Sequence, residues 1–182
     1  MNKLDNALKG GKGVLFVTGH YGGIEYIPIF LALKKYPISV IAKFATNDLK
    51  NKLYLQTNDL GLKIIDANQK NGVLTSIIQE LKENRIVFFE CDEIEEWKSS
   101  QKEKIFFLGK MIGVDRTINI IQKRTGAKII LGVLHRFNLG KYSLIIENYQ
   151  DILLQIGRNP SSVGEAILKS FEQYIYSYPE EW

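Results

Sequence analysis

Two hydrophobic patterns alternate along this chain. Short apolar runs rich in Val, Ile and Phe are typical of strands buried on both faces, and between them lie longer segments with apolar residues at helical spacing. The short runs predict strands at 13–19, 38–43, 63–66, 85–91 and 105–110. The longer segments predict helices at 24–36, 46–61, 72–84 and 115–126, and a last helix that opens at Asn159-Pro160.

Residues typical of helix ends support these boundaries. Pro28 would lie close to the first turn of its helix, where a missing N–H is tolerated. The helix over 115–126 would have Asp115 as its cap, and the glycine that closes this segment would stop it. Ser162 and Glu165 have the spacing of a capping box.

The order of the elements predicts the fold class. Apolar strands separated by amphipathic helices imply a mostly parallel sheet covered on both faces. The apolar runs 128–137 and 142–148 flank Asn-Leu-Gly-Lys and predict a hairpin, which adds an antiparallel pair. We therefore expect an α/β fold, a three-layer sandwich with a mostly parallel mixed sheet, as a single domain over residues 1–182. The polar stretch 92–104 is the best candidate for a loop, and 8–13 reads as a short basic loop.

Composition and charge narrow the classes of partner. The 182 residues are 45% hydrophobic and 24% charged, an ordinary globular balance with enough chain for a core. A net charge of +4 is compatible with nucleic acid, an anionic membrane surface or phosphorylated substrates. The basic residues are dispersed, so nucleic acid is not an expected partner. Because no apolar run could span a bilayer and the N-terminus lacks a signal-peptide core, we expect a soluble or peripheral protein.

The sequence lacks the residues and motifs that several kinds of functional site require. One cysteine and two histidines do not provide a disulfide framework, a Cys-based zinc finger or a His-rich metal site. The sequence contains no G-x-S-x-G elbow, no Walker phosphate loop and no G-x-G-x-x-G fingerprint. Cys91, at the end of the most apolar strand, is expected in the core. A nucleophile supplied by the protein is therefore not indicated.

The segment 15–25, Leu-Phe-Val-Thr-Gly-His-Tyr-Gly-Gly-Ile-Glu, joins the first strand to the first helix. Ligands of open α/β sheets collect beyond the carboxyl ends of the strands, where His20 falls. Gly22 and Gly23 would let the backbone approach a substrate and would leave amide groups free at a helix N-terminus. Glu25, in the first helical turn, would hydrogen-bond the imidazole and stabilise the imidazolium.

Such a pair is equipped to deprotonate a hydroxyl that attacks an acyl carbonyl, and general-base help of this kind is worth about 10²–10⁴ in rate. The alternative is a histidine that occurs by chance in a βα loop, beside a glutamate favoured by the helix dipole. The spacing alone does not decide between the two interpretations.

Three other charged residues are candidates for the site. Asp92 would order the edge of the sheet at which His20 lies, although an aspartate after a strand is also a common turn former. Lys110 and Arg116 flank a Gly-containing turn ahead of a helix and could hold a phosphate. The alternative for both cations is a solvated surface.

The residues around His20 resemble the hallmark block of the bacterial lipid A acyltransferase family, within the lysophospholipid acyltransferase superfamily. Residues 11–25 are similar to its Gly-rich lead-in, apolar strand and H-x₄-E motif, and His20 and Glu25 meet that spacing. Residues 81–92 resemble its helix–strand segment that ends in Asp, here Asp92.

Later segments resemble the same family in the same order. Residues 105–137 are similar to its Phe-x-Gly turn, helix and following strand with an arginine, here Arg136. The segment Tyr-Ser-Leu-Ile-Ile-Glu and the terminal Tyr-Pro-Glu-Glu-Trp resemble its closing blocks. The resemblance covers nearly the whole chain.

This resemblance implies a glycerolipid acyltransferase-like fold. It also implies an enzyme that moves a fatty acyl group from a thioester, on acyl carrier protein or coenzyme A, to a hydroxyl of a lipid or glycolipid such as a lipid A precursor. His20 would be the general base and Glu25 its orienter, and amides around Gly22 and Gly23, together with a cationic side chain, would steady the oxyanion. The remaining candidates would bind substrate; they are Asp92, Lys110, Arg116 and Arg136.

No cofactor beyond the thioester and no metal is expected. The expected location is cytoplasmic and peripheral to the inner membrane, on an anionic surface. Two alternatives stay open: an acyltransferase with a non-lipid acceptor, and a non-catalytic lipid-binding module that kept the fold. A hydrogen bond between His20 and Glu25, with the pair facing a groove open to solvent, would favour an enzyme.

Overall fold

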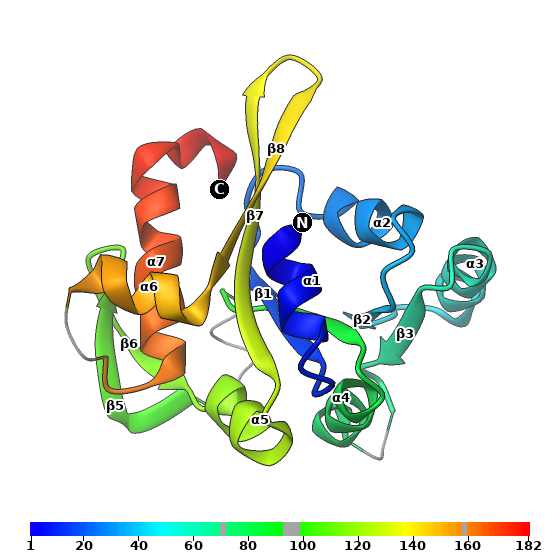
Figure 1. Ribbon diagram of the computed structural model, residues 1–182, viewed down its shortest axis with the longest axis horizontal. Helices are drawn as coiled ribbons and strands as arrows, with labels where there is room; N and C mark the ends of the chain where they lie inside the picture. The colour runs from blue at the N-terminus through cyan, green and yellow to red at the C-terminus, as the bar shows by residue number, and fades with distance from the viewer. Residues whose placement is uncertain (70–71, 93–98, 158–159) are drawn as a thin grey trace.

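The computed structural model describes residues 1–69, 72–92, 99–157 and 160–182. Its main sheet has six strands in the order β3-β2-β4-β1-β7-β8, and β8 runs antiparallel to β7 while the other neighbours are parallel (Figure 1). The strands of this sheet are β1 (Val14–Thr18), β2 (Ile38–Ala42), β3 (Lys63–Asp66), β4 (Ile86–Glu90), β7 (Lys128–Asn138) and β8 (Lys141–Asn148). The antiparallel strands β5 (Ser99–Phe107) and β6 (Lys110–Asp115) form a separate small sheet.

Helices connect and cover these strands. They are α1 (Asn2–Leu8), α2 (Tyr26–Leu33), α3 (Asn47–Asn58), α4 (Val73–Lys82), α5 (Thr117–Thr125), α6 (Tyr149–Ile156) and α7 (Val163–Ser177), followed by a short 3₁₀ helix, η1 (Pro179–Glu181). Pro28 is the third residue of α2, within the first turn as expected.

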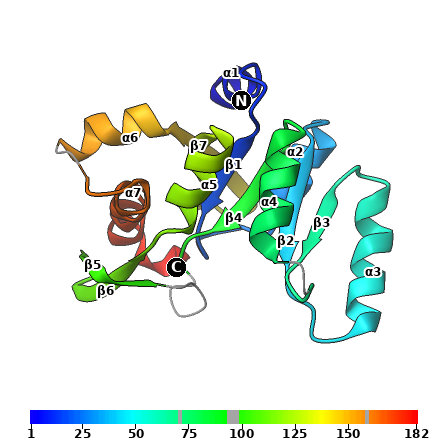
Figure 2. The ribbon, with the colours of Figure 1, turned by 90° about the horizontal axis from the view of Figure 1, so that it is seen from below.

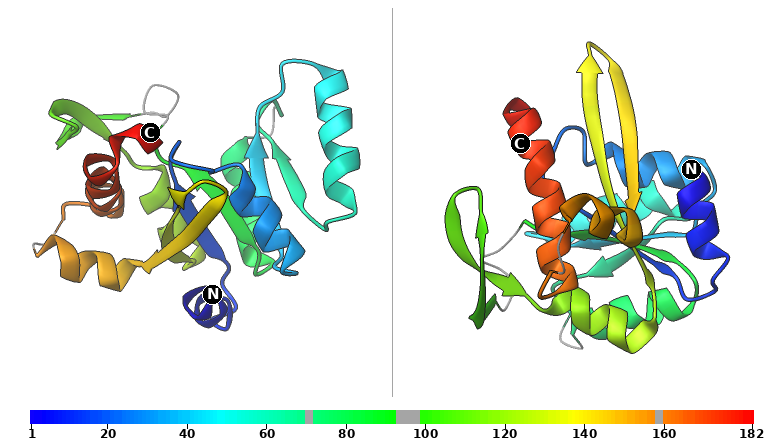
Figure 3. Two further views of the ribbon diagram at one scale, coloured as in Figure 1. Left: turned by 90° about the horizontal axis from the view of Figure 1, so that it is seen from above. Right: turned by 60° about the vertical axis from the view of Figure 1, so that its left-hand side comes forward.

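The sheet separates two hydrophobic cores. Successive side chains of β1 point to opposite faces, so that Leu15 and Val17 lie in one core and Phe16 in the other. Helices α4, α5, α6 and α7 contribute to the first core, and α1 and α2 to the second. Figures 2 and 3 show α6 and α7 separated from α2 by the sheet. The prediction of a three-layer α/β sandwich with a mostly parallel mixed sheet is therefore confirmed.

Strand and helix ends follow local rules in most places. The hairpin around Asn-Leu-Gly-Lys forms as predicted, with a two-residue turn closed by Gly140 at φ +68°. Ser162 caps α7, where its side chain accepts a hydrogen bond from the amide of Glu165 at 3.1 Å. The carboxylate of Glu165 accepts from Ser161 rather than from Ser162, so only half of the predicted capping box is present.

Two predictions about secondary structure are wrong, and one helix was not predicted. Residues 99–104, predicted as part of a loop, belong to β5, and β6 follows it in a hairpin that the sequence pattern did not indicate; residues 93–98 of the same predicted loop lie outside the described residues. The N-terminal residues 2–8 form α1, held by the burial of Leu4, although the sequence predicted no element there. Asp115 ends β6, so that Arg116 takes the N-cap position of α5 and makes no side-chain cap bond.

Within the described residues, no helix combines the length and the apolarity that a membrane crossing requires.

Candidate functional site

The neighbouring strands β1 and β4 end at the same edge of the sheet, and their pairing brings two predicted residues together. Thr18 pairs with Glu90 at the end of the ladder, and the amide of Cys91 donates to the carbonyl of Thr18 at 2.8 Å. His20 follows Thr18 by two residues, and Asp92 follows Glu90 by two residues. Because parallel strands in register continue side by side, His20 and Asp92 meet beyond the strand ends.

Asp92 holds His20 by two hydrogen bonds. The Nδ1 atom of the imidazole lies 3.0 Å from Oδ1 of Asp92, and the backbone amide of His20 donates to Oδ2 at 2.7 Å. An ionised carboxylate only accepts hydrogen bonds, so this contact requires the proton on Nδ1, and a neutral imidazole then has its lone pair on Nε2. The Asp92 side chain is 4% exposed and the His20 side chain 56% exposed. Asp92 is therefore buried and fixes the imidazole, while the His20 side chain is accessible to solvent.

Two other described groups lie next to this pair. The indole N–H of Trp182 donates to Oδ2 of Asp92 at 3.2 Å, so that three donors satisfy the buried carboxylate. On the other side of the ring, Oε2 of Glu90 lies 3.6 Å from Nε2 of His20. That distance is too long for a hydrogen bond, but the carboxylate would stabilise an imidazolium. Figure 3 shows the C-terminus beside the end of β1, as the contact with Trp182 requires.

Gly19 makes room for the pair. A Cβ atom at this position would lie 2.4 Å from the ring of Phe171 and 3.0 Å from Cγ of Asp92. Phe171 is fully buried in the core and has little freedom to move aside. The residue before His20 therefore has no space for a side chain, and this close approach lets the carboxylate reach the imidazole.

Glu25, the residue predicted to orient the imidazole, is not the partner of Nδ1 of His20. It is the N-cap residue of α2, it is exposed, and no hydrogen bond joins it to His20 in the part of the chain that the structure describes. The carboxylate on Nδ1 is that of Asp92. A role for Glu25 in the reaction stays a prediction that rests on the sequence resemblance.

The two glycines after His20 use their amides in a way that the sequence did not predict. The amide of Gly22 donates to the carbonyl of Glu181 at 2.6 Å, and that of Gly23 donates to the carbonyl of Leu134 at 3.3 Å. The expectation that both amides are free is therefore wrong. A Cβ at Gly22, where φ is +58°, would lie 2.0 Å from the oxygen of Leu134, so glycine is required for the close approach of β7.

A small polar pocket lies beside this turn. It has a volume of about 180 Å³ and is lined by Gly22, Arg136, Tyr142, Glu180 and Glu181. The predicted residue Arg136 thus lines a pocket together with the glycine two positions after His20. Its Nε atom is 3.8 Å from the carboxylate of Glu181, which leaves the guanidinium about half exposed.

An apolar groove opens next to the polar pocket. It has a volume of about 380 Å³ and lies between α2 and the β7–β8 hairpin, lined by Tyr26, Phe30, Leu134, Tyr142 and Leu144. Tyr142 belongs to both cavities. Known ligand sites are mostly apolar with a few convergent polar groups, and the combined polar pocket and apolar groove has that character.

Lys110 and Arg116 do not flank a turn. Lys110 opens β6 and Arg116 follows the end of that strand, so six residues of extended chain run from the first toward the second. Neither residue lines the polar pocket or the apolar groove. The predicted turn between these two residues is wrong, because the sequence pattern missed β6, and their role in binding a phosphate stays a prediction.

The second histidine, His135, packs against tyrosines of the loop after β1 and of the C-terminal segment. Nδ1 of His135 is 3.3 Å from the hydroxyl of Tyr21, and its ring lies against that of Tyr178 at 4.2 Å between centroids, tilted by 36°. Burial, with a smaller contribution from the charge of Glu181, raises the pKa of Tyr21 to about 12. The phenol is therefore neutral at physiological pH, and the cluster joins β7 to the C-terminal segment.

Sequence reasoning missed Glu90 and Trp182, and it underestimated Asp92. A usable signal was present: His20 and Asp92 each follow a buried apolar strand by the same short interval, and neighbouring parallel strands end together. Trp182 carried no such signal, because its contact with Asp92 depends on how α7 returns the chain to the sheet.

Comparison with models of known families identifies the family of this chain. The model of the family described as bacterial lipid A biosynthesis acyltransferase matches residues 1–182. A comparison with curated proteins finds no match. The family match thus includes the strand ends that carry His20 and Asp92 and the segment that carries Trp182.

Proposed function

Because the chain belongs to the bacterial lipid A biosynthesis acyltransferase family, we propose that it moves a fatty acyl group from a thioester, on acyl carrier protein or coenzyme A, to a hydroxyl of a lipid or glycolipid such as a lipid A precursor. The observation that carries the proposal is the His20–Asp92 pair at the carboxyl edge of the sheet. With Nδ1 facing Asp92, a neutral imidazole has its lone pair on Nε2, and the side chain is 56% exposed.

In the proposed reaction, Nε2 of His20 takes the proton of the acceptor hydroxyl as its oxygen attacks the thioester carbonyl. The tetrahedral intermediate collapses, the carbon–sulfur bond breaks, and the imidazolium returns its proton to the departing thiolate. Asp92 keeps Nδ1 protonated and stabilises the imidazolium between the two steps, and Glu90 adds negative charge near Nε2. The products are an ester and a free thiol, and no cofactor or metal is needed.

The oxyanion requires donors other than the glycine amides, since those already donate to backbone carbonyls. The amides of Ile24 and Glu25 precede the first turn of α2, and neither has an acceptor among the residues that the structure describes. Amides at a helix N-terminus favour negative charge. We assign the oxyanion to these two amides, with the motif residue Glu25 contributing through its backbone.

The apolar groove suits the acyl chain or the acceptor lipid. Its walls are aromatic and aliphatic, and its volume of about 380 Å³ lies within the range of ligand pockets. The adjoining polar pocket, with Arg136 and the two glutamates, would receive the polar part of a substrate. A lipid thus fits the two cavities better than the non-lipid acceptor that the sequence left open.

The test is acyl transfer by the purified protein, with acyl carrier protein and coenzyme A thioesters as donors and lipid A precursors and glycolipids as acceptors. Mass spectrometry identifies the acylated product. Wild-type protein should form it, and His20→Ala should abolish it while thermal unfolding stays unchanged, because the imidazole is more than half exposed. His135→Gln serves as the control for loss of a histidine.

The outcome also separates the alternatives. Lipid binding without turnover by the wild type, with His20→Ala indistinguishable from it, would favour the non-catalytic lipid-binding module. Turnover with a non-lipid hydroxyl or an amine, and none with lipids, would keep the mechanism and change the acceptor.

A further inference from the structure

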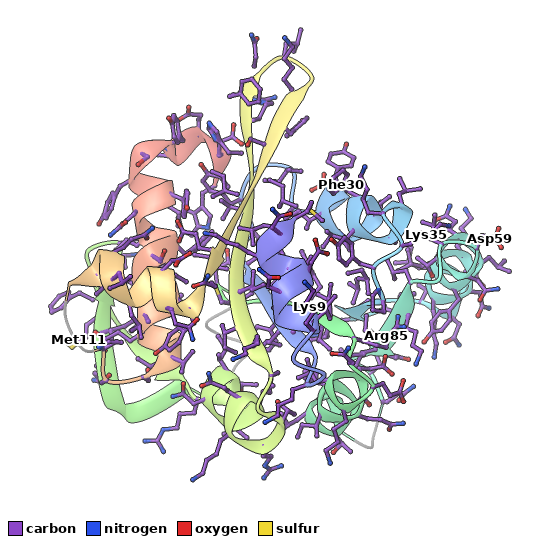
Figure 4. All side chains as sticks on the ribbon, viewed as in Figure 1. Lys9, Phe30, Lys35, Asp59, Arg85 and Met111 are labelled. Carbon is purple, nitrogen blue, oxygen red and sulfur yellow. The ribbon has the colours of Figure 1, made fainter. Side chains whose placement is uncertain are left out.

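An apolar surface extends from α2 to the tip of the β7–β8 hairpin. On α2, Tyr26, Phe30 and Leu33 follow one another at helical spacing, while Ile27 and Leu31 of the same helix are buried. The three exposed side chains are 53%, 41% and 62% accessible. Figure 4 shows Phe30 on the side of α2 toward which the hairpin projects.

The hairpin carries the second part of this surface. Phe137 and Leu139 are 61% and 91% exposed, and Leu139 occupies the two-residue turn itself. Turns of this kind favour polar residues, since their side chains face water. Figure 1 shows the hairpin projecting beyond the rest of the fold, so its tip can enter a second phase before other elements reach it.

The two parts are continuous. The rings of Tyr26 and Tyr142 lie 6.2 Å apart between centroids, and both line the apolar groove between α2 and the hairpin. We call the exposed side chains on both sides of this groove the α2–hairpin surface; it consists of Tyr26, Phe30, Leu33, Phe137, Leu139 and Tyr142.

Basic residues border this surface. Lys34 and Lys35 follow Leu33 at the end of α2, and Arg136 and Lys141 flank the hairpin tip; all four are exposed. The ammonium of Lys34 lies 5.7 Å from the centre of the Phe30 ring. Within 24–36 and 134–144, Glu25 is the only acidic residue, while Glu180 and Glu181 of the C-terminal segment line the polar pocket beside Arg136 and Tyr142. Aromatic and aliphatic side chains bordered by cations match the boundary between the headgroups and acyl chains of an anionic bilayer.

We propose that the α2–hairpin surface docks on an anionic bilayer, with Phe137 and Leu139 inserted below the headgroups and the four basic residues at the level of the phosphates. In this orientation the apolar groove opens toward the acyl region of the leaflet, and a lipid can enter it without crossing water. The docking surface stands on its own observations, and only its purpose rests on the proposed function.

Vesicle flotation tests the proposal without any turnover. Wild-type protein is mixed with pure phosphatidylcholine vesicles or with phosphatidylcholine–phosphatidylglycerol vesicles, over a salt series. The tip variant is Phe137→Ser with Leu139→Ser. Its matched control is Phe106→Ser with Leu154→Ser, which removes the same two residue types at 59% and 82% exposure from β5 and α6.

We expect the wild type and the control to bind the anionic vesicles and the tip variant to bind at least about tenfold more weakly, since full burial of one such side chain changes an equilibrium by about that factor. The double variant Lys34→Glu with Lys141→Glu should also weaken vesicle binding, and the loss should be larger at low salt. Its control, Lys82→Glu with Lys123→Glu, makes the same change in net charge on α4 and α5 and should weaken binding less.

Three results would overturn the proposal: no vesicle binding by the wild type, equal loss in the tip and control variants, or a dimer that the tip substitutions dissociate while vesicle binding is unchanged. The last would assign the surface to a second copy of the chain. Failure of the proposed function is a separate result, because a protein without acyl transfer activity would still float with vesicles through its hairpin tip.

Discussion

Replacement of Asp92 by asparagine tests the catalytic geometry most directly. The substitution Asp92→Asn keeps the shape of the side chain but replaces an acceptor-only carboxylate by an amide with one acceptor and one donor group. Three N–H donors converge on this side chain in the structure, from the His20 backbone, the His20 ring and Trp182. The amide nitrogen must therefore face at least one of them.

The loss of rate in Asp92→Asn depends on which of the three N–H donors loses its acceptor. Loss of the charge-assisted bond to the ring alone is worth about 1.5–3 kcal/mol, or about 10- to 150-fold in rate. If the amide N–H₂ faces Nδ1, it selects the tautomer with its proton on Nε2, which cannot act as a base. In a Ser-His-Asp triad that change lowers kcat by about 10⁴-fold. We expect kcat to fall by about 10²–10⁴-fold, with little change in KM.

The assay measures thiol release from the acyl donor together with the acylated product, and thermal unfolding shows that the fold is kept. Glu25→Gln is the matched control, a carboxylate-to-amide change at an exposed residue five positions after His20. It should lower the rate less than His20→Ala and less than Asp92→Asn. If Asp92→Asn turned over at the wild-type rate while Glu25→Gln lost activity, the motif glutamate would be the orienter and the reasoning from the structure would be refuted.

Three further perturbations have defined outcomes. Trp182→Phe removes one hydrogen bond to Asp92 and should lower kcat about tenfold with KM unchanged; an unchanged kcat would contradict this. Gly22→Ala should lower the free energy of unfolding by about 1–3 kcal/mol in denaturant titrations, because its Cβ meets backbone. The hydrogen bond from Lys50 holds the pKa of Asp66 below its usual value. The ionised Asp66 therefore stabilises the fold above about pH 4, and this contribution is lost as the pH falls further. Asp66→Asn should have a lower free energy of unfolding than the wild type near pH 7, and the difference should shrink in acid.

Much of the fold could be predicted because its signals are local. Buried parallel strands are continuous apolar runs, and amphipathic helices repeat their apolar residues every three to four positions, so each element is recognisable within its own segment. The same reasoning failed for β5 and β6, since a polar two-stranded sheet outside the main core carries neither pattern. It failed for α1 because a helix of seven residues is held by Leu4 in the core rather than by its own periodicity.

The candidate site divides in the same way. The sequence by itself determined that His20 and Asp92 follow buried strands at a ligand-binding edge, and that glycines surround the histidine. It suggested Glu25 as the partner of the imidazole, because residues close in sequence are the pairs that a motif reveals.

Only the tertiary structure decided that Asp92 is the partner. Its contact with His20 depends on the register that pairs Thr18 with Glu90, and the third hydrogen bond depends on α7, which returns Trp182 to the edge of the sheet. Strand register and chain return are set by the packing of the whole core. For that reason no single segment of the sequence contains them.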